Sequence, residues 1–132
     1  MSQYGKAKEL NAKPLIVCAL EIETQGQLDD YDVLYTGVGK VNATYTLTSH
    51  FGKYGTHIPY DLVINYGTAG SRKIKKKTLV DCTKFVQRDM SVTQLGFMDL
   101  QTPFESPNSM VVESTSEFNP IEKRQVCGTG DT

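Results

Sequence analysis

The sequence lacks any long apolar run, and this absence excludes one class of protein. No stretch approaches the roughly 20 consecutive apolar residues that a membrane-spanning helix needs. The first residues, MSQYGKAKELNAKP, are polar and contain no apolar core of a secretory signal. We therefore expect a cytoplasmic protein that has no membrane partner.

Cysteine is also sparse, and its spacing excludes two further classes of protein. The three cysteines, Cys18, Cys82 and Cys127, are odd in number, lie far apart and form no C-x-x-C motif. This pattern argues against a disulfide framework and against a zinc site. Cys18 and Cys127 stand beside apolar residues, so we expect both to be buried as small hydrophobic side chains, in a reducing compartment.

The chain has no excess of charge of either sign. Its formal net charge is -1, with 22% charged and 39% hydrophobic residues, which is ordinary for a globular protein. The one dense basic segment, SRKIKKK at residues 71–77, carries five positive charges in six residues. Because the chain as a whole is not basic, we interpret this segment as a solvated turn and expect no nucleic-acid partner.

What is present is the pattern of one α/β domain. The 132 residues fit a single domain, with a loose polar lead-in at residues 1–13 and the domain itself at residues 14–132. Continuous apolar runs predict strands that are buried on both faces, as in a parallel sheet. Apolar residues at helical spacing between Val41 and Phe51 predict a helix that ends near Gly52. The expected strands are residues 14–20, 31–37, 60–67, 78–90 and 126–128, with a loop at 98–107, and this order predicts a mixed sheet.

Two glycines precede the predicted helix in the motif TGVGK, Thr36–Lys40. A nucleoside-triphosphate loop needs the spacing G-x-x-x-x-G-K-[ST], but Leu34 stands at the first glycine position and Val41 follows the lysine. A dinucleotide-binding motif would need a further glycine near Asn42 and would follow the first strand. We interpret the motif as a tight turn, whose helix N-terminus could hold an anion or a hydroxyl-rich ligand.

Two carboxylates follow the first apolar strand in the segment ALEIET, Ala19–Thr24. Glu21 and Glu23 alternate there with Leu20 and Ile22. Ligands of α/β sheets bind at the carboxyl ends of strands, so these side chains are candidates for chemistry, although a solvated loop is the simpler interpretation. A carboxylate that is partly shielded from water there would have a raised pKa and could move protons.

Five motifs together resemble one family. LIVCALEIE, TGVGKVNAT, YDLVINYGTAGS, KKKTLVDCTKFVQRDMSVTQLGF and CGTGD occur in the order found in the 5'-methylthioadenosine/S-adenosylhomocysteine nucleosidases of the purine nucleoside phosphorylase superfamily. The resemblance implies a three-layer α/β fold around a mixed sheet, incomplete at its C-terminus. It implies hydrolysis of the N-ribosidic bond of adenine nucleosides, with no metal or organic cofactor, by a homodimer.

The resemblance also implies which residues form the site. Glu23 matches the carboxylate that orients and deprotonates the attacking water, and Thr68 matches a serine whose hydroxyl helps to hold that water and the ribose. Leu20 matches a methionine that packs against the sugar. The backbone of Gly67, Ala69 and Gly70 matches the turn that passes beside the base and ribose, where small residues permit a close approach.

The chain also departs from the family pattern. It resembles roughly the first two thirds of a family domain, and nothing in it matches the Met-Glu pair that grips the ribose or the aspartate that protonates the purine. General acid catalysis is worth about 10²–10⁴-fold, so we expect the isolated chain to be weak or inactive. Two alternatives stay open, which are a phosphate-dependent nucleoside phosphorylase and a non-catalytic binding or scaffolding remnant.

Overall fold

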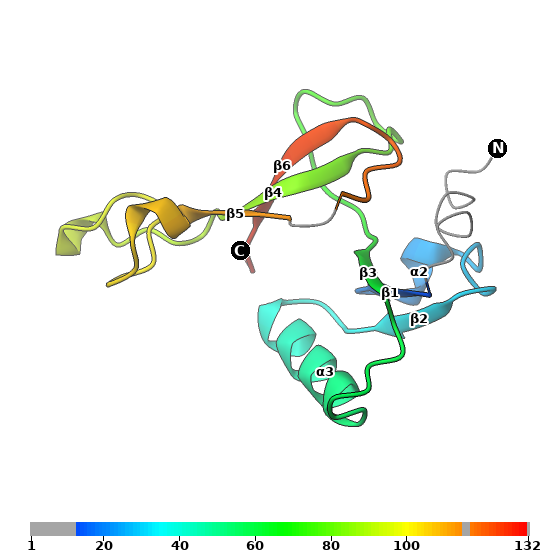
Figure 1. Cartoon of the computed structure of the whole chain (residues 1–132). Coiled ribbons are helices and arrows are strands. Elements are labelled where there is room, and N and C mark those ends of the chain that lie inside the picture. Colours follow the sequence, from blue (N-terminus) through cyan, green and yellow to red (C-terminus); the bar gives the residue numbers. More distant parts are fainter. Residues whose placement is uncertain (1–12, 115–116, 132) are drawn as a thin grey trace. The chain divides into compact units, whose positions relative to one another are not determined.

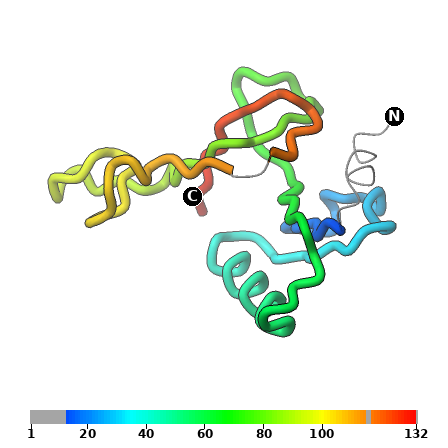
Figure 2. Tube along the Cα trace, in the orientation of Figure 1, coloured from blue at the N-terminus to red at the C-terminus, as the bar shows by residue number. Residues whose placement is uncertain are grey.

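The computed structural model describes residues 13–114 and 117–131, and it divides into two compact units, residues 1–73 and 74–132. Figure 1 labels the elements, and Figure 2 follows the path of the chain within each unit. The architecture is mixed α/β, as the sequence predicted. The predicted lead-in lies outside the described residues, except for Lys13.

The first unit is built on a parallel sheet whose strand order is β2-β1-β3. The strands are β1 (Pro14–Cys18), β2 (Asp32–Tyr35) and β3 (Leu62–Asn65), and both edge strands pair with β1 in parallel register. The predicted burial of the first strand is confirmed, because four consecutive residues of β1, Leu15 to Cys18, are at most 7% exposed. A central strand shielded on both faces requires such a continuous apolar run.

The third strand was expected to be buried as well, and this expectation is wrong. Half-buried and exposed residues alternate along β3, and Val63 is 49% exposed. Successive side chains of a strand point to opposite faces, so one face of β3 is half-buried and the other is exposed. The core of the first unit is therefore β1 together with Leu28, which is 2% exposed.

Two helices connect the strands of the first unit. The short helix α2 (Glu21–Thr24) follows β1 directly, where we had expected a strand end or a loop. The helix α3 (Lys40–Gly52) confirms the predicted helix and runs from the end of β2 toward β3 (Figure 1). Its predicted apolar face is covered only in part, since Leu47 and Phe51 are half-buried whereas Val41 is 79% and Tyr45 is 75% exposed.

The C-terminal end of α3 is instead held by aromatic contacts. The His50 ring stacks on Tyr60 with centroids 6.0 Å apart and meets the Tyr54 ring edge-on at 5.4 Å. Tyr54 also meets Tyr60 edge-on, at 6.1 Å. Aromatic pairs of this geometry contribute about 0.5–1.5 kcal/mol beyond the area they bury, so this cluster fastens α3 to the segment that leads into β3.

The second unit contains a separate three-stranded sheet of order β5-β4-β6. β4 (Asp81–Gln87) pairs antiparallel with β5 (Val111–Glu113) and parallel with β6 (Arg124–Thr129). We expected one mixed sheet, and the strands form two, because β1 to β3 pair only with one another, as do β4 to β6, among the described residues. The strand predicted at 78–90 is confirmed in its centre as β4, and the one predicted at 126–128 is confirmed and is longer at both ends.

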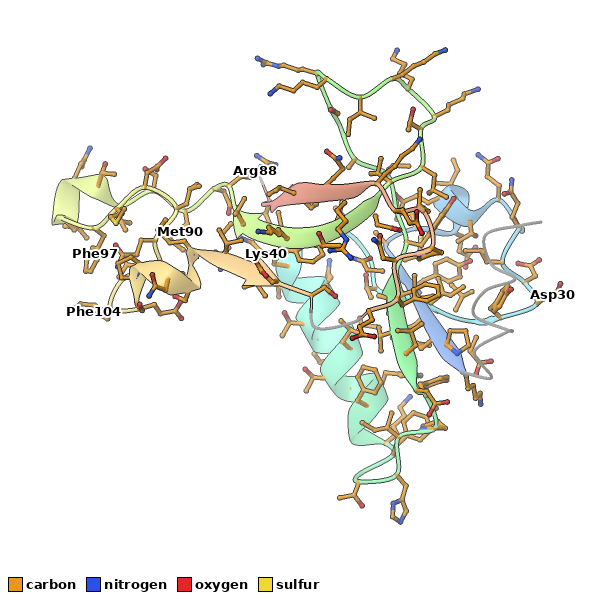
Figure 3. All side chains as sticks on the ribbon, turned by 45° about the horizontal axis from the view of Figure 1, so that its top comes forward. Asp30, Lys40, Arg88, Met90, Phe97 and Phe104 are labelled. Atoms are coloured by element: carbon orange, nitrogen blue, oxygen red, sulfur yellow. The ribbon has the colours of Figure 1, made fainter. Side chains whose placement is uncertain are left out.

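The connection between β4 and β5 is irregular, as predicted for residues 98–107. It carries two short 3-10 helices, η1 (Thr93–Leu95) and η2 (Pro107–Met110). Gln101 is buried and ties the loop together, since its Oε1 accepts from the Met98 N–H at 2.9 Å and its Nε2 donates to the Glu105 carbonyl at 2.8 Å. Phe97 and Phe104 lie together in this connection (Figure 3), with ring centroids 5.4 Å apart.

In the described part of the chain, no helix has both the length and the apolar character that crossing a membrane requires.

Candidate functional site

A carboxylate and a hydroxyl meet where the strand order of the first sheet changes direction. Glu23 lies on α2, just after β1, and Thr68 lies in the turn after β3. The Thr68 hydroxyl donates to Glu23 Oε1 at 2.7 Å, and the Thr68 backbone N–H donates to the same oxygen at 3.0 Å. Because β2 and β3 flank β1 on opposite sides, this contact spans the edge at which α/β sheets bind ligands.

The backbone at this edge is fixed by bonds beyond the ends of the strands. The Val17 carbonyl accepts from the Tyr66 N–H at 2.8 Å, which extends the β1–β3 pairing toward Thr68. On the other side, the Cys18 carbonyl accepts from the Thr36 N–H at 2.9 Å. The turns after all three strands therefore start from one rigid frame.

The short helix α2 orients Glu23 toward the sheet edge. The Glu23 carboxylate reaches back and accepts from the Leu20 N–H at 3.1 Å through Oε2, while the Glu23 N–H donates to the Leu20 carbonyl at 3.0 Å. The buried Thr24 hydroxyl donates a hydrogen bond to the Glu21 carbonyl at 3.0 Å and lies 2.9 Å from the Tyr35 hydroxyl. These contacts anchor α2 to β2 and aim Glu23 at β3.

Four donors surround the Glu23 carboxylate, and they decide its pKa. Burial raises the pKa, but hydrogen bonds from the Thr68 hydroxyl and N–H, the Leu20 N–H and the Cys18 thiol outweigh it and lower the pKa below its ordinary value. Our expectation of a raised pKa is therefore wrong. Burial is the largest single influence on this pKa, but each donor that bonds the charged form favours ionisation, and the four donors together exceed it.

The turn after β3 approaches Glu23 most closely at Gly67. A Cβ atom on Gly67 would lie 3.5 Å from Glu23 Oε1, which is ordinary contact distance but would occupy the space in front of the carboxylate. Ala69 and Gly70 continue the turn and are exposed. Leu20 is 44% exposed at the start of α2. The structure thus joins Glu23 to Thr68 and to the Leu20 N–H by hydrogen bonds and brings Gly67 near the carboxylate, while the Leu20 side chain, Ala69 and Gly70 are exposed.

The other acidic candidate and the glycine turn lie apart from this contact. Glu21 is exposed and makes no side-chain hydrogen bond among the described contacts. Gly37 and Gly39 adopt φ values of +77° and +97°, which explains why both positions of the TGVGK turn are glycine. This turn follows β2, on the opposite side of β1 from Thr68.

Sequence reasoning missed one residue of the site, Cys18. We interpreted it as a buried hydrophobic residue, and its burial is confirmed at 0% exposed, but its Sγ also lies 3.4 Å from Glu23 Oε2. Cys127, given the same interpretation, is only half-buried on β6. The one sequence signal for Cys18 was its place at the end of the strand that leads to the acidic segment.

In the second unit, two of the motifs that carried the resemblance lie side by side. The Arg88 N–H donates to the Thr129 carbonyl at 2.9 Å, and Asp89 Oδ2 accepts from the Asp131 N–H at 2.9 Å. A Cβ atom on Gly130 would lie 2.9 Å from Asp89 Cγ, so any larger residue there would force the Asp89 side chain to shift. This close approach explains the Gly-x-Gly-Asp pattern near residue 130.

The described residues contain no group of three or more His, Cys, Asp or Glu side chains that could hold a metal ion. The three cysteines are free thiols. No protein-family model and no curated protein matches this chain. The site must therefore be interpreted from its own geometry.

Proposed function

We propose that the Glu23–Thr68 pair serves the hydrolysis of the N-ribosidic bond of adenine nucleosides of the methylthioadenosine or S-adenosylhomocysteine type. The observation that carries the proposal is the double hydrogen bond from Thr68 to Glu23 Oε1, across the edge between β1 and β3. The resemblance supplies the substrate class, and with it the three-layer nucleoside-phosphorylase-like fold and the homodimer. No cofactor belongs to this proposal.

The lowered pKa of Glu23 suits this chemistry. The transition state of glycoside hydrolysis resembles an oxocarbenium ion, and an ionised carboxylate stabilises that positive charge. Since its pKa is lowered, Glu23 is a weak base, and it takes the proton of water late, once the bond to the sugar carbon has largely formed. The electron pair of the broken C–N bond leaves with the purine.

The contacts of Glu23 also indicate how water would be admitted. A carboxylate offers about four lone-pair sites, and each oxygen of Glu23 already accepts from two donors. One donor must therefore turn away before a water can bind. The Thr68 hydroxyl is the donor that is exposed and rotates freely, so it releases Oε1 and then accepts from or donates to the incoming water.

The experiment compares Glu23→Gln with a matched control, Glu21→Gln, which makes the same change two residues away on the exposed side of α2. Release of adenine from methylthioadenosine is followed without and with phosphate. Because the chain offers no match for the purine-protonating aspartate, we expect slow turnover. A second readout is therefore binding of a nucleoside analogue whose sugar ring carries a protonated nitrogen.

We expect wild type and Glu21→Gln to bind the cationic analogue equally, and Glu23→Gln to bind it about 10–100-fold more weakly, as the loss of a charged hydrogen-bond partner implies. Wild type should release adenine in the absence of phosphate, and Glu23→Gln should not release it. Turnover only with phosphate would show a phosphorylase instead. Equal binding by all three proteins would refute the assignment of Glu23.

A further inference from the structure

Cys18 is the last residue of β1. Unlike its neighbours in the strand, it both fills the core and makes polar contacts through its side chain. Leu15, Ile16 and Val17 fill the core with apolar atoms alone, whereas Cys18 places Sγ 3.4 Å from Glu23 Oε2 and 3.4 Å from the Leu20 carbonyl. A thiol has one proton, so it can donate to one of these oxygens at a time. The carboxylate is the stronger acceptor because it is charged.

The surroundings of Cys18 keep its proton in place. Burial, together with the hydrogen bond to Glu23 and the charge of that carboxylate, raises the pKa of the Cys18 thiol despite bonds to Leu20 and Ala19 that lower it. The thiol therefore remains S–H near neutral pH, where Glu23 is ionised. A neutral thiol donates to a carboxylate, whereas a thiolate would repel it.

We propose that Cys18 is a positioning residue for Glu23, whose thiol holds Oε2 from inside the sheet so that Oε1 faces Thr68. The Leu20 N–H holds the same oxygen from the helix side, so the two donors together fix the plane of the carboxylate. The inference rests on the proposed function of Glu23. Misplacement of a reacting group by about 1 Å costs about 10²-fold in rate, which gives such a contact its weight.

The rival interpretation is that Cys18 only fills space, and two substitutions separate the two. Cys18→Ala removes the donor, whereas Cys18→Ser keeps a donor of similar size at the same place. Cys127→Ala repeats the alanine change at a half-buried cysteine of the second unit. The first readout is the pKa of the Glu23 carboxyl, followed by NMR of the labelled side chain.

We expect the pKa of Glu23 to rise toward its ordinary value in Cys18→Ala and to stay near the wild-type value in Cys18→Ser and Cys127→Ala. In adenine release, kcat should fall about 10-fold in Cys18→Ala with KM nearly unchanged, and the acid limb of the pH profile should move to higher pH. Equal pKa values of Glu23 in the alanine and serine variants would show that Cys18 acts through packing alone.

A measurement on the otherwise intact site covers the case in which Cys18→Ala does not fold. The infrared S–H stretch reports the acceptor of the thiol proton, and we expect one S–H band to shift in Glu23→Gln but not in Glu21→Gln. An unmoved band overturns the proposal. Neither the NMR nor the infrared readout needs turnover, so an absence of adenine release would count against the proposed function and leave the test of Cys18 intact.

Discussion

Replacing Thr68 by valine tests whether the hydroxyl of the β3 turn stabilises the ionised form of Glu23. The change removes the donor at 2.7 Å and leaves the backbone N–H at 3.0 Å in place. A hydrogen bond to a charged group is worth about 1.5–3 kcal/mol. Thr68 is exposed, and screening by water reduces this, so we expect Thr68→Val to lower the free energy of unfolding by about 1 kcal/mol near neutral pH.

The pH dependence of that loss follows from the direction of the pKa shift. The pKa of Glu23 is lower in the folded chain than in the unfolded one. Its contribution to stability is therefore present above the unfolded pKa of about 4.3 and is lost as the pH falls through the folded pKa. The difference between wild type and Thr68→Val should accordingly be largest near neutrality and shrink as the pH falls below the unfolded pKa and through the folded one.

Urea unfolding at a series of pH values measures this difference directly, with Thr68→Ser as the variant that restores the hydroxyl. The matched control is Thr44→Val, since the exposed Thr44 hydroxyl donates at 2.8 Å to the uncharged Lys40 carbonyl on α3. The change in the free energy of unfolding caused by Thr44→Val should be the same over the pH range in which Glu23 titrates. A loss in Thr68→Val that is the same at every pH would refute the reasoning.

Two further predictions concern the space around two glycines and one hydrogen bond between hydroxyls. Gly130→Ala should destabilise the second unit by about 1–3 kcal/mol because its Cβ would meet Asp89 Cγ at 2.9 Å, whereas Gly52→Ala, with nothing within 4 Å, should stabilise α3 by about 0.4–1 kcal/mol. Urea unfolding of both variants measures the two changes in the free energy of unfolding. Equal changes in Gly130→Ala and Gly52→Ala would contradict this prediction. The Thr24–Tyr35 hydroxyl pair at 2.9 Å should show a coupling of about 1 kcal/mol in a cycle of Thr24→Val and Tyr35→Phe, and additive effects would exclude the contact.

Much of the first unit could be predicted because its sequence pattern is produced by burial. The apolar run of β1 reflects its place between two strands, and the helical spacing before Gly52 reflects α3. The helix α2 could not be predicted, because its four residues alternate acidic with β-branched side chains, as a half-exposed strand does. β5 was missed because it has only three residues and all of them are exposed, so it carries no pattern of burial.

The sequence singled out Glu23 and Thr68 but missed Cys18 and the electrostatics of the Glu23 carboxylate. Glu23 and Thr68 were candidates through the resemblance of their motifs, and the structure places them in contact. The sign of the pKa shift of Glu23 depends on donors from two separate turns and on the Cys18 thiol, and only tertiary structure shows that they converge. Sequence periodicity reports which face a residue takes, and carries no information about how many donors a carboxylate receives.

The Glu23–Thr68 contact joins residues that are 45 positions apart, with β2 and α3 between them. Closing a loop of that length costs about 3 kcal/mol of chain entropy in addition to a constant, and we expect the β1–β3 pairing to offset this cost, so that the contact forms together with that pairing. The helix α3 has local contacts and can form on a much shorter timescale. The ionisation of Glu23 is therefore a reporter of folding, since its pKa falls at the step in which the two distant strands come together.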